Sequence, residues 1–258
     1  ADTFIVSGRG ELHLAILIET MRREGYEMEV SQPEVVLKEI EGEICEPYEF
    51  LSIDLPAEYK GVIISELGRR RAELKEITQN QSGEWHFEYL ITTRGLLGLK
   101  GMLLKRTRGT AIIHHVFDAY WPIVADLPKQ EPHGSLVATE DGLSTSYAIA
   151  NAEGRGELFI GHAIPVYRGM VVGQASRDRD VDLNICKQKK LTNMRSSTSD
   201  VTVVLTPPRE LTLELALEYI GQDELLEVTP KNLRVRKRVA DMKLRLRSQR
   251  ETLEEQDK

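Results

Sequence analysis

The fold of the middle of the chain is decided by the stretch Glu84-Trp85-His86-Phe87-Glu88-Tyr89-Leu90-Ile91. Aromatic and aliphatic side chains at every second position alternate with mostly polar ones, which is the period of a half-buried β-strand. We predict a strand here. Because two acidic residues share the stretch with the aromatic ones, we expect those aromatic side chains to lie in a protein core rather than to stack on RNA bases.

Five further elements surround this strand in an order that specifies a fold. The sequence predicts strands at residues 50–55, 77–80 and 110–117, and helices at residues 59–74 and 94–104, the second one interrupted by glycines. The resulting order is strand, helix, strand, strand, helix, strand. That order is typical of a ferredoxin-like βαββαβ domain, which we place at residues 39–120.

The segment before this domain predicts a smaller set of elements. Residues 4–6 predict a strand, residues 11–24 a helix with one apolar face that Gly25 terminates, and residues 26–30 another strand. A strand–helix–strand unit of this size cannot cover its own apolar face. We therefore expect residues 1–38 to be the C-terminal part of a truncated α+β domain, and the chain to start inside that domain.

The segment after the ferredoxin-like domain has a different sequence pattern. Turn signals recur between short apolar runs, which favours β-structure. One helix is predicted at residues 212–220, and the alternation at residues 233–236 resembles an edge strand. We expect residues 121–258 to form a β-rich domain with one main helix, a basic loop at residues 176–199 and a charged tail. The fold class of the whole chain is α+β.

The composition excludes some classes of protein. The chain has 258 residues, a formal net charge of −7 and two cysteines. It has no apolar stretch of the roughly 20 residues that a membrane span needs, and it has no signal-peptide pattern. The cysteines are far apart in sequence, which is typical of a reduced protein. We expect a cytoplasmic, monomeric protein with no membrane partner.

One short segment stands out against the acidic balance of the chain. Residues 187–197 read Lys-Gln-Lys-Lys-Leu-Thr-Asn-Met-Arg-Ser-Ser, with four cations, no acidic residue and no helical or strand period. Lysine and arginine neutralise phosphates, and threonine and asparagine supply hydrogen bonds. We predict RNA-binding residues here: Lys187, Lys189, Lys190, Thr192, Asn193 and Arg195.

A second group of cations belongs to the predicted ferredoxin-like domain. No acidic residue occurs from Tyr89 to Phe117. We include six of the domain's cations among the candidate RNA-binding residues: Arg69, Arg70, Arg71, Lys100, Lys105 and Arg106. Two purely structural roles stay open for them, because the arginines follow a helix whose dipole favours cations at its end, and because charged residues often form a solvated face.

A search for catalytic motifs finds no phosphate-binding P-loop, no G-x-S-x-G and no HExxH. His114 and His115 are adjacent, so in a strand they point to opposite faces and cannot easily ligate one metal ion. We predict no catalytic residue and no metal site. Two alternatives to RNA binding remain: a protein-interaction module, and an enzyme that uses His114, His115 and Asp118.

The sequence also resembles a known family. Ser7-Gly8-Arg9-Gly10-Glu11-Leu12-His13-Leu14 is similar to the end of domain III of translational GTPases, and Glu46-Pro47-Tyr48-Glu49 with the βαββαβ unit is similar to their domain V. The gap from Pro33 to Glu46 is too short for the domain IV of elongation factor G. The block at residues 189–195 and Leu225-Leu226-Glu227-Val228-Thr229-Pro230 resemble signatures of the BipA/TypA family.

This resemblance implies a ribosome-associated GTPase that acts in stress adaptation and large-subunit assembly. Its GTP- and Mg²⁺-binding domain would precede Ala1, so that no cofactor is expected in this chain. The implied partners are the ribosome, the rRNA of its large subunit and the acceptor stem of an A-site tRNA. The implied docking elements are domain V and the basic loop of the C-terminal domain.

Overall fold

The computed structural model describes residues 3–80, 83–125, 127, 133–188, 204–245 and 247. These residues form two compact units. One is continuous and comprises residues 33–131; we call it the ferredoxin-like unit. The other joins residues 1–32 to residues 132–258, and we call it the bipartite unit.

The ferredoxin-like unit confirms the predicted βαββαβ order. It contains β3 (Glu43–Pro56), α2 (Lys60–Arg69), β4 (Glu73–Gln79), β5 (Glu84–Thr92), α3 (Thr93–Leu96), α4 (Leu99–Arg106) and β6 (Ile112–Pro122). A short 3-10 turn (Ala57–Tyr59) precedes α2. The antiparallel sheet has the order β4-β5-β3-β6, and β2 (Lys38–Ile40) pairs with the first residues of β3.

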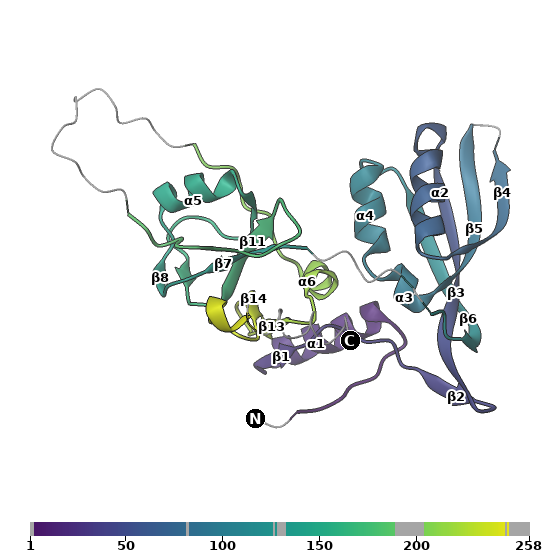
Figure 1. Cartoon of the computed structure of the whole chain (residues 1–258), viewed down its shortest axis with the longest axis horizontal. Coiled ribbons are helices and arrows are strands. Elements are labelled where there is room, and N and C mark those ends of the chain that lie inside the picture. The colour runs from purple at the N-terminus through teal and green to yellow at the C-terminus, as the bar shows by residue number, and fades with distance from the viewer. Residues whose placement is uncertain are drawn as a thin grey trace. The chain divides into compact units, whose positions relative to one another are not determined.

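Both long helices of this unit cover the same face of its sheet (Figure 1). Ile63 and Leu67 of α2 and Leu99 and Leu103 of α4 pack on the inward side chains of β3 and β5. Phe87 is fully buried and Tyr89 nearly so, which confirms that the aromatic residues of β5 belong to the core. Burial of this apolar area is the main stabilising contribution to the unit.

Two backbone positions explain where the predicted helices of this unit were wrong. The helix predicted at residues 59–74 ends at Arg69, because Arg71 has a positive φ of 58° that a right-handed helix cannot contain. The helix predicted at residues 94–104 is split into α3 and α4 by Gly98, whose φ is 67°. Glycine adopts this conformation without steric cost.

The bipartite unit is built on a sheet of order β1-β13-β14-β11-β7-β12, with β9 pairing β11. Its strands are β1 (Met28–Val30), β7 (Ser135–Ala138), β9 (Gly156–Leu158), β11 (Met170–Ala175), β12 (Val181–Leu183), β13 (Glu224–Val228) and β14 (Leu233–Lys237). β8 (Gly142–Leu143) and β10 (Pro165–Val166) form a separate small ladder.

The helices α1 (Glu11–Arg23), α5 (Ser146–Glu153) and α6 (Leu213–Tyr219) also belong to the bipartite unit, and residues 242–245 are helical as well. Residues of β11 divide between two cores. Met170 and Val172 pack with Ala148 and Ile149 of α5, whereas Val171 packs in the cluster of α1 and α6. The sheet therefore carries an apolar cluster on each face.

The division of the chain differs from the expected domains 1–38, 39–120 and 121–258. Residues 1–32 do not stand apart from the C-terminal region. β1 pairs antiparallel with β13, and Ala15 and Ile18 of α1 are buried in the same cluster as α6. The C-terminal region thus covers the apolar face that the N-terminal segment is too small to cover alone. The following segment, with β2, joins the ferredoxin-like unit.

Three other expectations for the bipartite unit were wrong. Phe4, Ile5 and Val6 form no strand and are exposed. β14 lies between β13 and β11 and is therefore not an edge strand. The edge-strand prediction was wrong because alternation of apolar and polar residues indicates that one face of a strand is solvated, and says nothing about how many neighbouring strands pair with it. The loop expected at residues 176–199 includes a strand at its start, since β12 (Val181–Leu183) pairs parallel with β7.

Candidate nucleic-acid interface

Three of the six predicted cations of the ferredoxin-like unit, Arg69, Arg70 and Arg106, gather around one buried carboxylate. Glu66 of α2 is 3% exposed and accepts hydrogen bonds from Arg69 Nη2 at 3.1 Å and Arg70 Nε at 2.8 Å. Arg106 Nη1 of α4 lies 3.9 Å from the other carboxylate oxygen. Burial would raise the pKa of Glu66, but the hydrogen bonds and charges of Arg70 and Arg69 outweigh burial and lower it. Three cations thus surround one anion.

The three consecutive arginines have different surroundings. Arg70 also donates from Nη1 to the carbonyl oxygens of Gly95 at 2.7 Å and Leu97 at 2.9 Å. Its guanidinium therefore ties the end of α2 to α3 and has little capacity left for a phosphate. Arg69 and Arg106 each keep about half of the side chain exposed. Arg71 is exposed and follows the helix.

The two lysines of α4 are exposed cations of this group. Lys100 and Lys105 are both exposed, and within the described residues neither forms an ion pair. Leu99 and Leu103 on the same helix are buried, so that packing fixes the orientation of α4. Together with Arg69, Arg71 and Arg106, these lysines form what we call the α2/α4 cation cluster.

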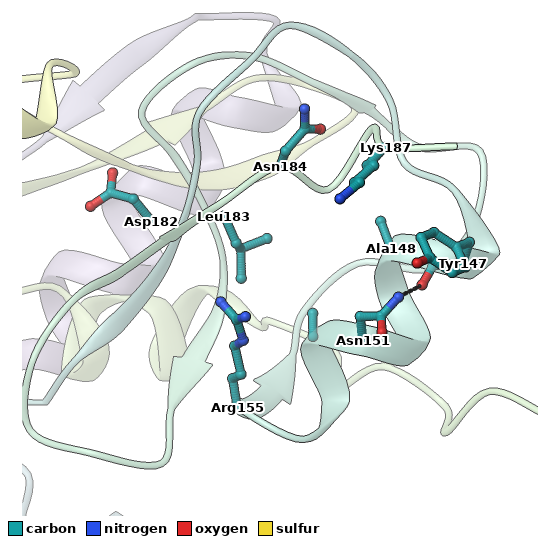
Figure 2. A pocket seen from close by; sticks show the side chains of 9 residues that line it. Tyr147, Ala148, Asn151, Arg155, Asp182, Leu183, Asn184 and Lys187 are labelled. Atoms are coloured by element: carbon teal, nitrogen blue, oxygen red, sulfur yellow. Dashed lines mark hydrogen bonds between the residues drawn. The ribbon is translucent and has the colours of Figure 1, made fainter. Parts of the chain in front are cut away.

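The basic segment of the bipartite unit is described only at its beginning. Lys189, Lys190, Thr192, Asn193 and Arg195 lie outside the described residues. Lys187 is described and exposed, and its backbone carbonyl accepts a hydrogen bond from Thr145 Oγ1 at 2.6 Å. Its side chain lies at the edge of an open pocket beside α5 (Figure 2).

Two acidic residues that precede this segment, Asp180 and Asp182, form contacts within the unit. Asp180 accepts from the backbone N–H of Ser135 at 3.0 Å and lies 2.9 Å from Lys237 Nζ. Asp182 accepts from Arg245 Nη2 at 2.5 Å. These contacts stabilise the segment before Lys187 and compensate its negative charge.

Sequence reasoning missed the cation that faces Lys187. Arg155 lines the same pocket, together with Tyr147 and Asn151 of α5 and Asn184 after β12. Arg155 stands alone in a Gly154-Arg155-Gly156 turn, and a single charge in a turn carries no periodic signal. Only the packing of α5 against the sheet brings it near Lys187.

The histidine pair does not form a shared site. His115 Nδ1 lies 2.5 Å from Glu49 Oε2, and Thr93 Oγ1 donates to Glu49 Oε1 at 2.8 Å. His114 is paired with Ser52 across the ladder, and Asp118 accepts from Trp121 Nε1 at 3.1 Å. Within the described ranges, no group of three or more histidine, cysteine or acidic side chains is arranged to hold a metal ion.

The helices of the described part of the chain are short or amphipathic. None of those helices has both the length and the apolar character that crossing a bilayer requires.

Two family models match this chain, and they meet at the second of the two boundaries between the structural units, near residue 131. The family model described as TypA/BipA C-terminal domain matches residues 133–242, and the one described as elongation factor G C-terminus matches residues 43–131. The second match coincides with the ferredoxin-like unit, and the first with most of the C-terminal portion of the bipartite unit.

Three similar proteins have names that contain BipA or TypA. A large ribosomal subunit assembly factor BipA from Synechocystis is 49% identical over 95% of this chain, and the one from Bacillus subtilis is 44% identical over 92%. A putative elongation factor TypA-like protein of Arabidopsis chloroplasts is 48% identical over 91% of the chain. The chain spans 40%, 39% and 35% of the lengths of these three relatives.

Proposed function

Because this chain belongs to the TypA/BipA family, we propose that it is the ribosome-binding portion of a translational GTPase and docks on large-subunit rRNA. Two cationic regions would make the contacts: the α2/α4 cation cluster, and the basic segment that begins at Lys187. The relatives' name, large ribosomal subunit assembly factor, supports the ribosome as partner.

The observation that carries the proposal is the exposed charge on α4. Lys100 and Lys105 lie without an ion-pair partner among the described residues, in a chain whose net charge is −7. Exposed cations on a rigid helix contribute to phosphate binding through release of counterions. Packing of Leu99 and Leu103 holds this helix in place before any RNA binds.

The basic segment would make the second contact. Lys189, Lys190 and Arg195 would neutralise phosphates, and Thr192 and Asn193 would donate or accept hydrogen bonds. The acceptor stem of an A-site tRNA is a further partner under this proposal. Binding and hydrolysis of GTP with Mg²⁺ would belong to a domain outside this chain and would control when the chain binds. The site of action would be the cytoplasm.

Charge reversal tests the proposal directly. Lys105→Glu and the triple change Lys189→Glu, Lys190→Glu, Arg195→Glu should each lower cosedimentation with large ribosomal subunits without lowering the melting temperature. Each lost phosphate contact should also make the log–log salt dependence of binding less steep by about 0.7 to 0.9. Lys231→Glu is the matched control, because Lys231 is an exposed lysine in the turn between β13 and β14.

Two results would contradict the proposal. Unchanged cosedimentation of both reversed variants would exclude both cationic regions. Binding that survives nuclease treatment and about 0.5 M salt would instead favour the protein-interaction module, since phosphate contacts are greatly weakened under those conditions.

A further inference from the structure

An open pocket of about 380 Å³ lies beside α5 in the bipartite unit. Its walls come from α5, from the turn that carries Arg155, and from the end of β12 with the residues up to Lys187 (Figure 2). We call it the α5 pocket. All of its lining residues are described, and neither the family matches nor the names of the relatives assign it a ligand.

The charge of the α5 pocket is positive. The side chains of Arg155 and Lys187 extend into the hollow from opposite sides (Figure 2). Within the described chain neither cation has a carboxylate partner. The lining carboxylate, Asp182, is bound by Arg245 at 2.5 Å, and the side chain of Arg245 is only 6% exposed. Two uncompensated cations across a concave surface attract an anion.

The floor of the α5 pocket is apolar. Ala148 and Ala152 lie one helical turn apart on α5 and are 6% and 3% exposed, and Leu183 lines the pocket from β12. Tyr147 stands at its edge with 37% of its surface exposed. Small side chains leave room for a planar ring, and an exposed tyrosine offers a face on which a base can stack. A bare phosphate would use neither feature.

Two amides line the same hollow with one hydrogen-bonding atom already engaged. Asn151 donates from Nδ2 to the carbonyl oxygen of Tyr147 at 2.6 Å, and Asn184 Oδ1 accepts from the backbone N–H of Cys186 at 2.9 Å. Asn151 therefore retains its Oδ1 as an acceptor, and Asn184 retains its Nδ2 as a donor. A free amide oxygen such as Asn151 Oδ1 can accept a hydrogen bond from the edge of an unpaired base.

The position of Lys187 is fixed by the same residue that starts α5. Thr145 Oγ1 accepts the N-capping hydrogen bond from Ala148 N at 3.2 Å and donates to the carbonyl of Lys187 at 2.6 Å. One hydroxyl thus connects the start of α5 to the backbone of Lys187, and so fixes two walls of the α5 pocket relative to each other. Lys187 is also the first residue of the basic segment.

We propose that the α5 pocket binds one unstacked nucleotide of single-stranded RNA, an inference that rests on the proposed RNA-binding function. The phosphate lies between Arg155 and Lys187. The base lies over Ala148 and Ala152 against Tyr147, with its edge toward Asn151.

A titration of the whole ¹⁵N-labelled chain with hexauridylate tests this site. Backbone signals of residues 147–155 and 183–187 should shift on titration. The double variant Arg155→Ala, Lys187→Ala should bind hexauridylate about tenfold more weakly, the loss expected for charge-assisted hydrogen bonds. Its log–log salt dependence should be less steep by about 1.4. The matched control is Lys231→Ala, Arg238→Ala, which removes the same charges from exposed positions.

Three outcomes would overturn the inference. They are unchanged affinity of the double variant, equal shifts of the pocket signals with inorganic phosphate, and equal shifts with hexaglutamate, which would indicate an acidic protein partner. Cosedimentation of the Lys105→Glu variant with large ribosomal subunits distinguishes a failure of the α5 pocket inference from a failure of the proposed function. If Lys105→Glu still weakens subunit binding, the proposed function stands without the α5 pocket.

Discussion

Glu224, the first residue of β13, is a buried anion with several partners. Its side chain is 1% exposed, and Ser135 Oγ donates to Oε1 at 2.6 Å. Lys237 Nζ lies 3.0 Å from the same oxygen, and His133 Nε2 lies 3.3 Å from Oε2. Burial would raise the pKa of Glu224, but His133 and Lys237 outweigh burial and lower the pKa to about 2.

The depressed pKa of Glu224 predicts acid sensitivity. The folded-state pKa lies below the ordinary value of 4.5, so the carboxylate stabilises the fold above pH 4.5, and this contribution is lost as the pH falls toward 2. It amounts to roughly 3 kcal/mol. Glu224→Gln should therefore flatten the pH dependence of the free energy of unfolding between pH 4.5 and 2, measured by urea denaturation.

Glu214→Gln is the control for this prediction, because Glu214 is exposed on α6. An unchanged pH dependence in Glu224→Gln would show that Glu224 is not the titrating group.

At the scale of single residues, the sequence predicts which side chains are charged but not which of them form hydrogen bonds or ion pairs within the fold. Arg69, Arg70 and Arg71 are indistinguishable as a run of three arginines. In the structure Arg70 binds one carboxylate and two carbonyl oxygens, whereas Arg71 is exposed with a positive φ. This difference depends on the distance between α2 and α3, which follows from packing and from no local pattern.

Two helices of the bipartite unit begin with a threonine N-cap of the same kind. Thr145 Oγ1 accepts from Ala148 N at 3.2 Å at the start of α5, and Thr212 Oγ1 accepts from Leu215 N at 3.3 Å at the start of α6. Of these two threonines, Thr145 also holds the carbonyl of Lys187. A comparison of the two threonines can therefore distinguish the stabilisation of a helix from a contribution to the α5 pocket.

Removal of each hydroxyl should give different results. Thr145→Val and Thr212→Val should each lower the free energy of unfolding by about 1 kcal/mol, because each leaves a helix N-terminus uncapped. Thr145→Val alone should also weaken hexauridylate binding, because Lys187 loses its anchor. Thr145→Ser should restore both properties. Equal weakening of binding by Thr212→Val would mean that general destabilisation is the cause.

At the scale of elements, the sequence is most informative where one face is buried and one solvated. The prediction for residues 84–91 agrees with β5 because β5 has such a face. α5 was not predicted, since its buried residues Ala148, Ile149 and Ala152 are mostly small and give a weak apolar pattern. The α5 pocket could not be predicted for the same reason, because it depends on this helix and on a parallel pairing of distant strands.

At the scale of the whole molecule, segments at opposite ends of the sequence share one core. Met28, Glu29 and Val30 pair with Val228, Glu227 and Leu226. Arg236 of β14 adds an ion pair to Glu29 at 2.6 Å. The sequence alone separates residues 1–38 as a domain because pairing partners about 200 residues apart leave no local signal.

This organisation predicts that a defect in α1 affects only one unit. Ile18 is 8% exposed within the cluster of α1, α6 and β13, so Ile18→Ala should destabilise the bipartite unit by about 2 kcal/mol or more. The two tryptophans of the chain, Trp85 and Trp121, both belong to the ferredoxin-like unit. Tryptophan fluorescence therefore reports the unfolding of that unit alone, whereas far-ultraviolet circular dichroism reports both units.

In Ile18→Ala, the circular dichroism transition in urea should broaden or split toward lower concentrations, while the fluorescence midpoint stays where it is in the unchanged chain. Ile16→Ala is the control on the same helix, because Ile16 is 57% exposed and should leave both signals unchanged. A fluorescence midpoint that moves together with the circular dichroism midpoint would show that the two units unfold as one. The bipartite core would then stabilise the ferredoxin-like unit as well, and variants of the α2/α4 cation cluster would need stability controls from both units.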